Sequence, residues 1–221
     1  MTVSSPSLEL LDRIRRELAP EEGANRLIPL VESGRLPEER LAWLAGEEYR
    51  IIRSDRRSFL LLASRFAEPP AVDFFTGLAQ GEALALDKLV TFARAIDVEQ
   101  SDLEAYEPRP GCQAYAAYVA WLALNGSQGE VALALIANFA AWGSYCAAVS
   151  AALRSQYKLD DEACGFFDFF ATPVPEVEEQ AVAVAEASVD AGEPPVGAVR
   201  LARMVQAYEL LFWNTLADGI D

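Results

Sequence analysis

The sequence predicts an all-α protein whose helices form one bundle. Ala, Leu and Glu, which favour helices, are abundant, and the alternating β-branched runs typical of strands are missing. Proline, glycine and short polar turns divide the chain into segments of helical length. Hydrophobic residues make up 52% of the 221 residues, which is enough to bury a sizeable core.

Nine helices are expected from these signals. Gly34 stops the second helix, Pro37 opens a long third helix, and Pro69 with Pro70 ends it. The polar, proline-containing residues 101–110 are expected to form a connection. The expected helical ranges are 7–18, 23–33, 37–67, 71–96, 111–125, 128–157, 160–171, 175–191 and 196–217.

The segment 128–157 is apolar nearly all round and contains many small residues. A helix without a polar face lies at the centre of its protein, so we expect this segment to be the core helix. No long linker, low-complexity stretch or internal repeat interrupts the chain. We therefore expect a single helical domain over residues 1–221.

The composition excludes several function classes. With 18 Lys and Arg against 34 Asp and Glu, the net charge of −16 argues against direct nucleic-acid binding, which needs a basic face. No apolar run is expected to reach the ~18 residues of a membrane span, so we expect no membrane partner. The N-terminal residues lack a signal-peptide pattern, and three cysteines are an odd, sparse set, so we expect a cytoplasmic protein with reduced thiols.

Histidine is absent from the sequence. Ser/His/Asp and Cys/His catalysis, a proximal haem histidine and histidine-ligated metals are therefore excluded. We expect no cofactor and no metal. Glu82 is an acidic residue of the type found in di-metal helical bundles, but Leu86 stands where a histidine is expected.

Ordered motifs resemble the TenA family, the thiaminase II relatives with a haem-oxygenase-like fold. The last helix contains YELLFWN at 208–214, similar to the terminal Y-E-x-x-F-W signature of that family. Earlier segments match in the same order over about residues 37–218. They are EEY at 47–49, the stretch 85–97, PGCQAYAAY at 110–118 and ALIANF at 134–139. The resemblance implies a haem-oxygenase-like multi-helical bundle that assembles as a homodimer or homotetramer. Trp43 and Trp121 are candidate interface anchors, and packing in the core explains them equally well.

The resemblance also implies a ligand pocket. Glu209 matches the C-terminal glutamate of the family and would exchange protons with a bound base; Tyr208 and Phe212 are expected to lie beside it in the pocket. Glu47 or Glu48 matches a carboxylate that recognises an aminopyrimidine ring. Because consecutive helical residues point about 100° apart, only one faces the pocket and the other is expected to be solvated. Tyr115 matches the family tyrosine, although helix packing with Tyr118 accounts for it almost as well.

The main departure from the family is at its cysteine nucleophile. Asn138 falls at that position, and an amide cannot attack a substrate. Cys146 is displaced around the helix, and Cys112 is a weak substitute near Tyr115; packing in the core is the simpler role for the cysteines. Trp142 and Phe170 (or its neighbour Phe169) stand near family tyrosines, so the pocket is expected to be more apolar.

Three functions remain open from the sequence. The first is a diverged TenA-like protein that binds a small nitrogen heterocycle, aminopyrimidine- or thiamin-related, without cysteine-dependent thiaminase II activity. The second is a C–N hydrolase of thiamin salvage in which Glu209 and Glu47 or Glu48 activate water. The third is a scaffold or an indirect regulator, as the family's label of transcription activator suggests. Convergence of two carboxylates on one substrate atom would separate the second function from the first, because a general base that activates water needs it. A filled or collapsed pocket would support the third.

Overall fold

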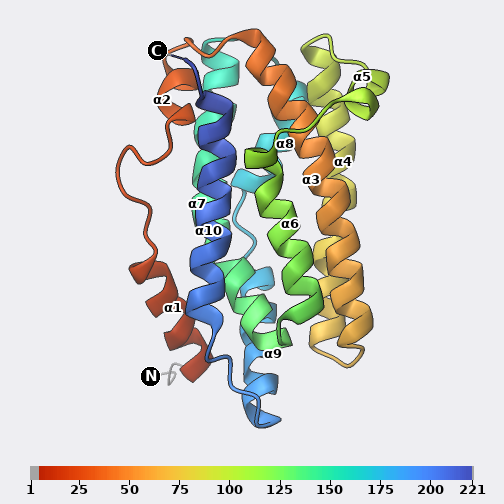
Figure 1. Cartoon of the computed structure of the whole chain (residues 1–221), viewed down its shortest axis with the longest axis vertical. Coiled ribbons are helices and arrows are strands. Elements are labelled where there is room, and N and C mark those ends of the chain that lie inside the picture. Colours follow the sequence, from red (N-terminus) through yellow and green to blue (C-terminus); the bar gives the residue numbers. More distant parts are fainter. Residues whose placement is uncertain (1–4, 221) are drawn as a thin grey trace.

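Ten helices make up the part of the chain that the structure, a computed structural model, describes, namely residues 5–220. That range contains no strand, so the all-α prediction is confirmed. Figure 1 shows the long helices lying side by side along the long axis of the molecule. The helices are α1 Pro6–Glu17, α2 Leu27–Glu32, α3 Glu38–Arg65, α4 Ala71–Ala95, α5 Gln100–Ala105, α6 Pro110–Asn125, α7 Gln128–Ser155, α8 Asp161–Ala171, α9 Pro175–Asp190 and α10 Ala198–Ala217.

Two local expectations are wrong for identifiable reasons. The expected connection 101–110 contains the helix α5, because Glu99 and Asp102 form a reciprocal capping box in which the Asp102 side chain accepts from Glu99 N at 2.9 Å. The helix α2 starts four residues later than expected. The Asn25 side chain accepts hydrogen bonds from the backbone N–H groups of Leu27 and Ile28, which caps the helix there.

The helices α3 and α4 form a long antiparallel pair, since only residues 66–70 connect them. Residues at equal distances from this connection therefore lie at the same level of the pair. Asp55 precedes the end of α3 by ten residues, and Glu82 follows the start of α4 by eleven. These two acidic residues therefore lie at nearly the same height along the helix pair.

The helix α7 is the apolar helix expected at the centre, and it packs against α1, α2, α8, α9 and α10. Its length and composition alone would allow it to cross a membrane, so the expectation that no apolar run reaches that length is wrong. It is the one such helix among the described residues. It packs against five other helices, and 39% of its most apolar 18-residue window is buried.

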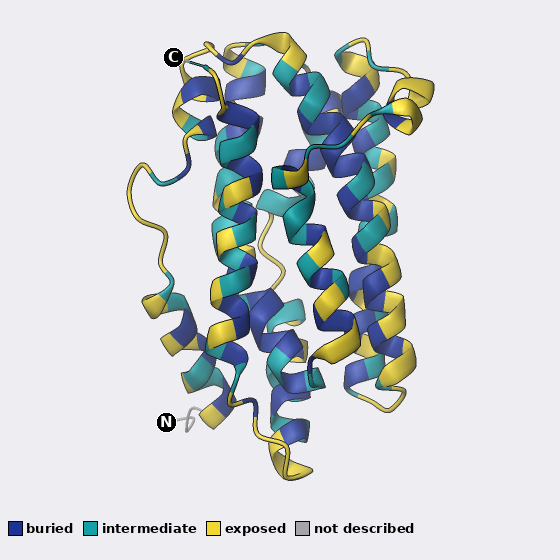
Figure 2. Ribbon diagram, in the orientation of Figure 1, coloured by how far each residue is buried: buried dark blue, intermediate teal, exposed yellow. Residues whose placement is uncertain are grey.

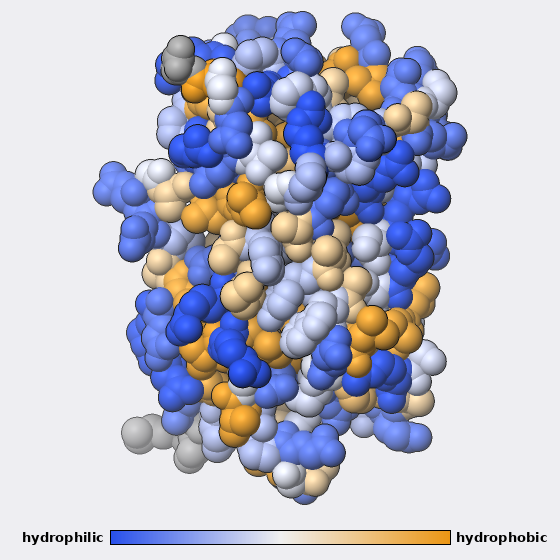
Figure 3. All heavy atoms as spheres, viewed as in Figure 1, coloured by the Kyte–Doolittle hydropathy of each residue, from blue (hydrophilic) through white to orange (hydrophobic). Residues whose placement is uncertain are grey.

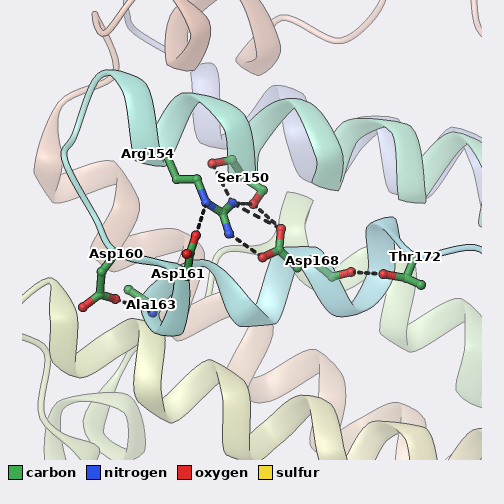
Figure 4. Close-up of polar contacts among 7 residues, drawn as sticks. All are labelled: Ser150, Arg154, Asp160, Asp161, Ala163, Asp168 and Thr172. Carbon is green, nitrogen blue, oxygen red and sulfur yellow. Dashed lines mark hydrogen bonds and ion pairs between the residues drawn. The ribbon is translucent and has the colours of Figure 1, made fainter.

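A polar network fixes α8 against the end of α7 (Figure 4). The Arg154 guanidinium of α7 donates to Asp161 at 2.7 Å and to Asp168 at 2.6 Å, both on α8. Ser150 Oγ also donates to Asp168, at 2.5 Å. The Asp160 side chain accepts from Ala163 N at 2.9 Å and caps α8 at its start. These contacts hold the phenylalanines at the end of α8 in place.

Buried residues line the inward faces of the helices, and exposed residues lie outside (Figure 2). They form two core clusters, one around Trp213 and Phe92 and the other around Phe74 and Leu133. Tyr115 packs against both clusters. The region between the two clusters is where the candidate site lies.

Candidate functional site

A pocket of about 760 Å³ lies where the two core clusters meet. Side chains of α3, α4, α6, α7 and α10 line it, and the segment between α8 and α9 lies along its rim. Trp142 packs edge-on to Phe170, with ring centroids 5.8 Å apart, and tilted against Phe212 at 6.1 Å. The expected aromatic residues Trp142, Phe170 and Phe212 therefore belong to one wall of the pocket.

Glu209 of α10 lines the pocket and is 3% exposed. The Asn138 amide of α7 donates a hydrogen bond to its carboxylate. Burial raises the pKa of Glu209 to about 8, although the hydrogen bond from Asn138 opposes this shift. A carboxyl with a pKa close to neutral can both take up and release a proton near physiological pH.

The alternative between Glu47 and Glu48 is resolved by their positions on α3. Glu48 lines the pocket, is 3% exposed and makes no hydrogen bond or ion pair to any described residue. Burial raises its pKa well above the usual value of 4.5, and the charges of Glu82, Glu47 and Glu209 add to this. Glu48 is thus a pocket carboxyl without a partner in the protein.

Glu47 points away from the pocket, and the expectation of a solvated charge is wrong. Its side chain is fully buried and accepts from the Tyr106 hydroxyl at 2.8 Å and from Arg109 N at 2.7 Å. The Gln113 amide donates to its second oxygen at 2.5 Å. A buried carboxylate needs donors of this kind. Since all three come from α6 or the segment just before it, Glu47 links α3 to the start of α6.

Tyr115 lines the pocket from α6, and its hydroxyl makes no hydrogen bond to any described residue. Burial raises its pKa, and the charges of Asp55, Glu209, Glu82 and Glu48 raise it further. The charges of all four pocket carboxyls therefore favour the neutral form of this one hydroxyl. The neutral phenol can donate to a ligand.

Tyr208 does not line the pocket, so the expectation for this residue is wrong. Its ring packs against Tyr118, with centroids 5.3 Å apart, on the surface where α6 meets α10. Tyr208 precedes Glu209 directly, and adjacent helical residues point about 100° apart. Because Glu209 faces the pocket, the side chain of Tyr208 points away from it.

Two acidic pocket residues were not expected there: Asp55 of α3 and Glu82 of α4. Asp55 is 3% exposed, and its Oδ1 is buried without a hydrogen-bond partner. Burial and the neighbouring charges of Glu82 and Glu48 raise the pKa of Asp55, and burial raises the pKa of Glu82 to about 8. Asp55 follows Glu48 by seven residues, two helical turns, and this spacing could have revealed it.

None of the three cysteines lines the pocket. All are free and buried, and burial raises the pKa of Cys146 and Cys112 above the usual value for a thiol. Among residues 5–220, no group of three or more His, Cys, Asp or Glu side chains is arranged to hold a metal ion. The chemistry available in the pocket is that of carboxyls, a phenol and an amide.

Comparison with known proteins agrees with this architecture. Solved structures with similar folds include a TenA homologue from P. horikoshii OT3, with TM-score 0.69, 18% identity and coverage of 95% of this chain and 97% of that one. A TenA family transcription regulator from Silicibacter sp. TM1040 has TM-score 0.69 and 17% identity, with coverage of 97% and 98%. No curated protein matches the sequence.

A domain of unknown function from Shewanella denitrificans OS217, described as having a haem oxygenase-like fold, has TM-score 0.68 and 16% identity, with coverage of 96% and 88%. The expected haem-oxygenase-like fold is therefore confirmed. The sequence profile of the TENA/THI-4/PQQC family matches residues 27–218, which is most of the chain. This chain belongs to the TENA/THI-4/PQQC family.

Proposed function

We propose that the protein binds a small, planar nitrogen heterocycle of the aminopyrimidine or thiamin-related class, and that it lacks cysteine-dependent thiaminase II activity. One observation carries the proposal. Glu48, Tyr115, Asn138 and Glu209 converge from four helices on one aromatic-walled pocket, and no cysteine is part of its lining. Aminopyrimidine edges offer N–H donors and ring nitrogens, which carboxyls and a phenol can bind.

Each polar residue has a separate role in this proposal. Asn138 donates to Glu209 and leaves its own Oδ1 buried without a partner, so this oxygen is available to an exocyclic amine. The Glu48 carboxyl has no hydrogen-bond partner among the described residues, so it is also available to the ligand. The rings of Trp142 and Phe212 provide flat apolar surface for the heterocycle.

Thermal unfolding with an aminomethyl-aminopyrimidine tests this proposal. A ligand that binds only the folded state raises the melting temperature, and we expect Glu209→Ala to abolish the rise. Covalent displacement depends on a thiolate, so we expect thiamin turnover to lie about 10⁴-fold or more below that of a cysteine enzyme. Turnover of thiamin at ordinary enzymatic rates, or no thermal shift with any aminopyrimidine, would contradict the proposal.

A second candidate is C–N hydrolysis through a carboxyl pair. Glu48 and Glu209 share the pocket. Burial raises the pKa of Glu48, and the charges of Glu82, Glu47 and Glu209 add to it, so Glu48 can stay protonated while Glu209 is ionised. Such a pair could activate water and protonate a leaving amine. Slow thiamin hydrolysis that is lost in both Glu48→Gln and Glu209→Gln would favour this candidate. A scaffold or indirect regulator would be favoured by a filled pocket, whereas this one has about 760 Å³.

A further inference from the structure

The pocket contains many acceptors and few donors. Glu48, Asp55 and Glu82 make no hydrogen bond or ion pair to any described residue, although each lines the pocket. Asn138 Oδ1, which carries no charge, is also buried without a donor. Buried acceptors without partners destabilise a protein, so a ligand that brings N–H groups is the simplest way to satisfy them.

The pocket holds no protein cation that could neutralise these carboxyls. Arg15 is the one Lys or Arg among the described lining residues. It lies at the rim, where its guanidinium is 2.7 Å from Glu178 Oε2 and is thereby neutralised. Acidic side chains therefore face the pocket from α3, α4, α9 and α10, and no Lys or Arg side chain among the described residues pairs with those of α3, α4 and α10.

The four carboxyls are spread along the pocket rather than gathered at one point. The charge of Glu82 raises the pKa of both Asp55 and Glu48, and the charges of all four carboxyls raise the pKa of Tyr115. Glu48 and Asp55 are seven residues apart on α3, roughly 10 Å along its axis. Asp55 and Glu82 face each other at one level of the α3–α4 pair. The ring of the proposed function occupies the Glu48 and Glu209 end, so the Asp55 and Glu82 end is left for another part of the ligand.

We propose that Asp55 and Glu82 form a second subsite that binds a protonated amine on a flexible arm of the ligand. This inference rests on the proposed function and adds the class of substituent. The aromatic wall at Phe59 and Phe74 encloses the same end of the pocket, because both residues lie on the faces of α3 and α4 that carry the two acids. A carboxyl pair among apolar side chains suits an ammonium group, which donates three hydrogen bonds.

The space at this end also fits an arm. Gly77 and Gly81 of α4 line the pocket one helical turn apart, and a Cβ added to either would meet nothing within 4 Å. No α4 side chain fills the pocket at these two positions, and Gly77 is exposed to solvent. This side of the pocket therefore has room for a short aliphatic chain.

Three aminopyrimidines that differ in one substituent test the subsite by calorimetry. The substituent is a methyl group, a hydroxypropyl arm or an aminopropyl arm. We expect the wild type to bind the amine about tenfold or more tightly than the hydroxyl compound. Asp55→Asn and Glu82→Gln should each reduce this preference to about twofold or less, while leaving the affinity for the methyl compound within about twofold.

Glu179→Gln is the matched control. Glu179 lies at the exposed rim of the same pocket, so this variant removes one negative charge without touching the subsite. We expect it to retain the preference for the amine. Loss of the preference in Glu179→Gln to the same extent would overturn the inference, because attraction to the overall charge of −16 would then explain the result.

Failure of the subsite and failure of the proposed function give different results. If the methyl compound binds through Glu209 but the amine has no advantage over the hydroxyl, the subsite is wrong and the proposed function stands. If no pyrimidine binds, but diaminopentane binds and this binding is lost in Asp55→Asn, the proposed heterocyclic ligand is wrong and the amine subsite stands. Circular dichroism checks that both variants fold. If Asp55→Asn does not fold, the result for Glu82→Gln alone decides the test.

Discussion

At the residue scale, three of the four pocket carboxyls, Glu48, Asp55 and Glu82, have no hydrogen-bond or ion-pair partner among the described residues. A soluble protein ordinarily pairs a buried carboxylate with donors, as it does for Glu47. Glu48 lies next to it in the sequence and is equally buried, yet it has no such donor. This contrast between neighbouring glutamates separates a structural residue from a candidate ligand-binding one.

That contrast gives a first prediction. Glu47→Ala removes the acceptor of Tyr106, Arg109 and Gln113, so we expect it to lower the free energy of unfolding by about 3 kcal/mol. Glu48→Gln is expected to leave stability unchanged or slightly raised, because it removes a buried acid that has no partner. Urea unfolding of both variants checks this, and a larger loss in Glu48→Gln would contradict it.

The pocket carboxyls also predict how stability depends on pH. In the unfolded chain a glutamate ionises near its usual 4.5, whereas in the folded protein burial holds the pKa of Glu82 and Glu209 at about 8. The folded state thus binds more protons between these values. The contribution of these two carboxyls to the free energy of unfolding is therefore highest below about pH 4.5, falls as the pH rises, and levels off above about pH 8.

The double variant Glu82→Gln/Glu209→Gln isolates this effect. Glu48, Asp55 and Tyr115 face the same groups, and Arg15, Glu178 and Glu179 lie at the rim; all of them are retained in the variant. We therefore expect the difference in unfolding free energy between variant and wild type to grow from about pH 5 to about pH 8. A difference that is constant over this range would refute the raised pKa values as its cause.

The sequence predicted the polar site in part. Glu209, Tyr115 and Asn138 were found through motifs, and all three line the pocket. Asp55 carries no motif and was missed, although its spacing from Glu48 puts it on the same helical face. The choice between Glu47 and Glu48, and the outward direction of Tyr208, depend on how α3 and α10 are rotated about their axes. Only packing against neighbouring helices determines that rotation.

At the element scale, the position of α8 sets the aromatic wall of the pocket. Arg154 ties α8 to α7, and Phe170 near the end of α8 contacts Trp142 of α7. Gly143 lets the two helices approach, since a Cβ there would lie 3.0 Å from the Phe170 carbonyl oxygen. The expected ends of α7 and α8 were correct to within two residues, but this close approach is not readable from the sequence.

Gly143→Ala is accordingly expected to push the end of α8 outwards. The clash is with backbone, which cannot rotate away, so we expect a loss of about 1–3 kcal/mol in unfolding free energy and weaker aminopyrimidine binding. Gly81→Ala is the matched control, because its methyl group enters open space and removes a helix-interior glycine. It should gain up to about 1 kcal/mol. Equal effects of the two substitutions on thermal unfolding would contradict the argument.

At the scale of the whole molecule, one surface combines exposed aromatic and aliphatic side chains. Trp121 is 48% exposed, Leu124 65% and Leu211 42%, and the Trp121 ring stacks on Tyr118 with centroids 5.5 Å apart. These residues belong to α6 and α10, which pack side by side. On this side of the molecule, hydrophobic side chains interrupt the hydrophilic surface (Figure 3).

The expected homodimer or homotetramer remains a prediction, and this surface indicates how to test it. Trp43 is a weaker anchor than Trp121, because Arg40 and Arg109 stack on its ring at 3.9 and 3.2 Å and so satisfy it within one chain. Trp121 has one face stacked on Tyr118 and is otherwise available to a second copy. Aromatic residues of this kind are enriched at the centre of protein interfaces.

Light scattering at micromolar concentration is expected to give a mass of two or four chains for the wild type. Trp121→Glu places a charge in the proposed contact between copies, where desolvating it is unfavourable, so the mass should fall towards that of one chain, 24.1 kDa. Trp43→Ala should lower stability through lost stacking while leaving the mass unchanged. A wild-type monomer would refute assembly, and an unchanged mass in Trp121→Glu would refute this surface as the interface. Since the pocket lies between the two core clusters of one chain, loss of assembly should leave aminopyrimidine binding intact.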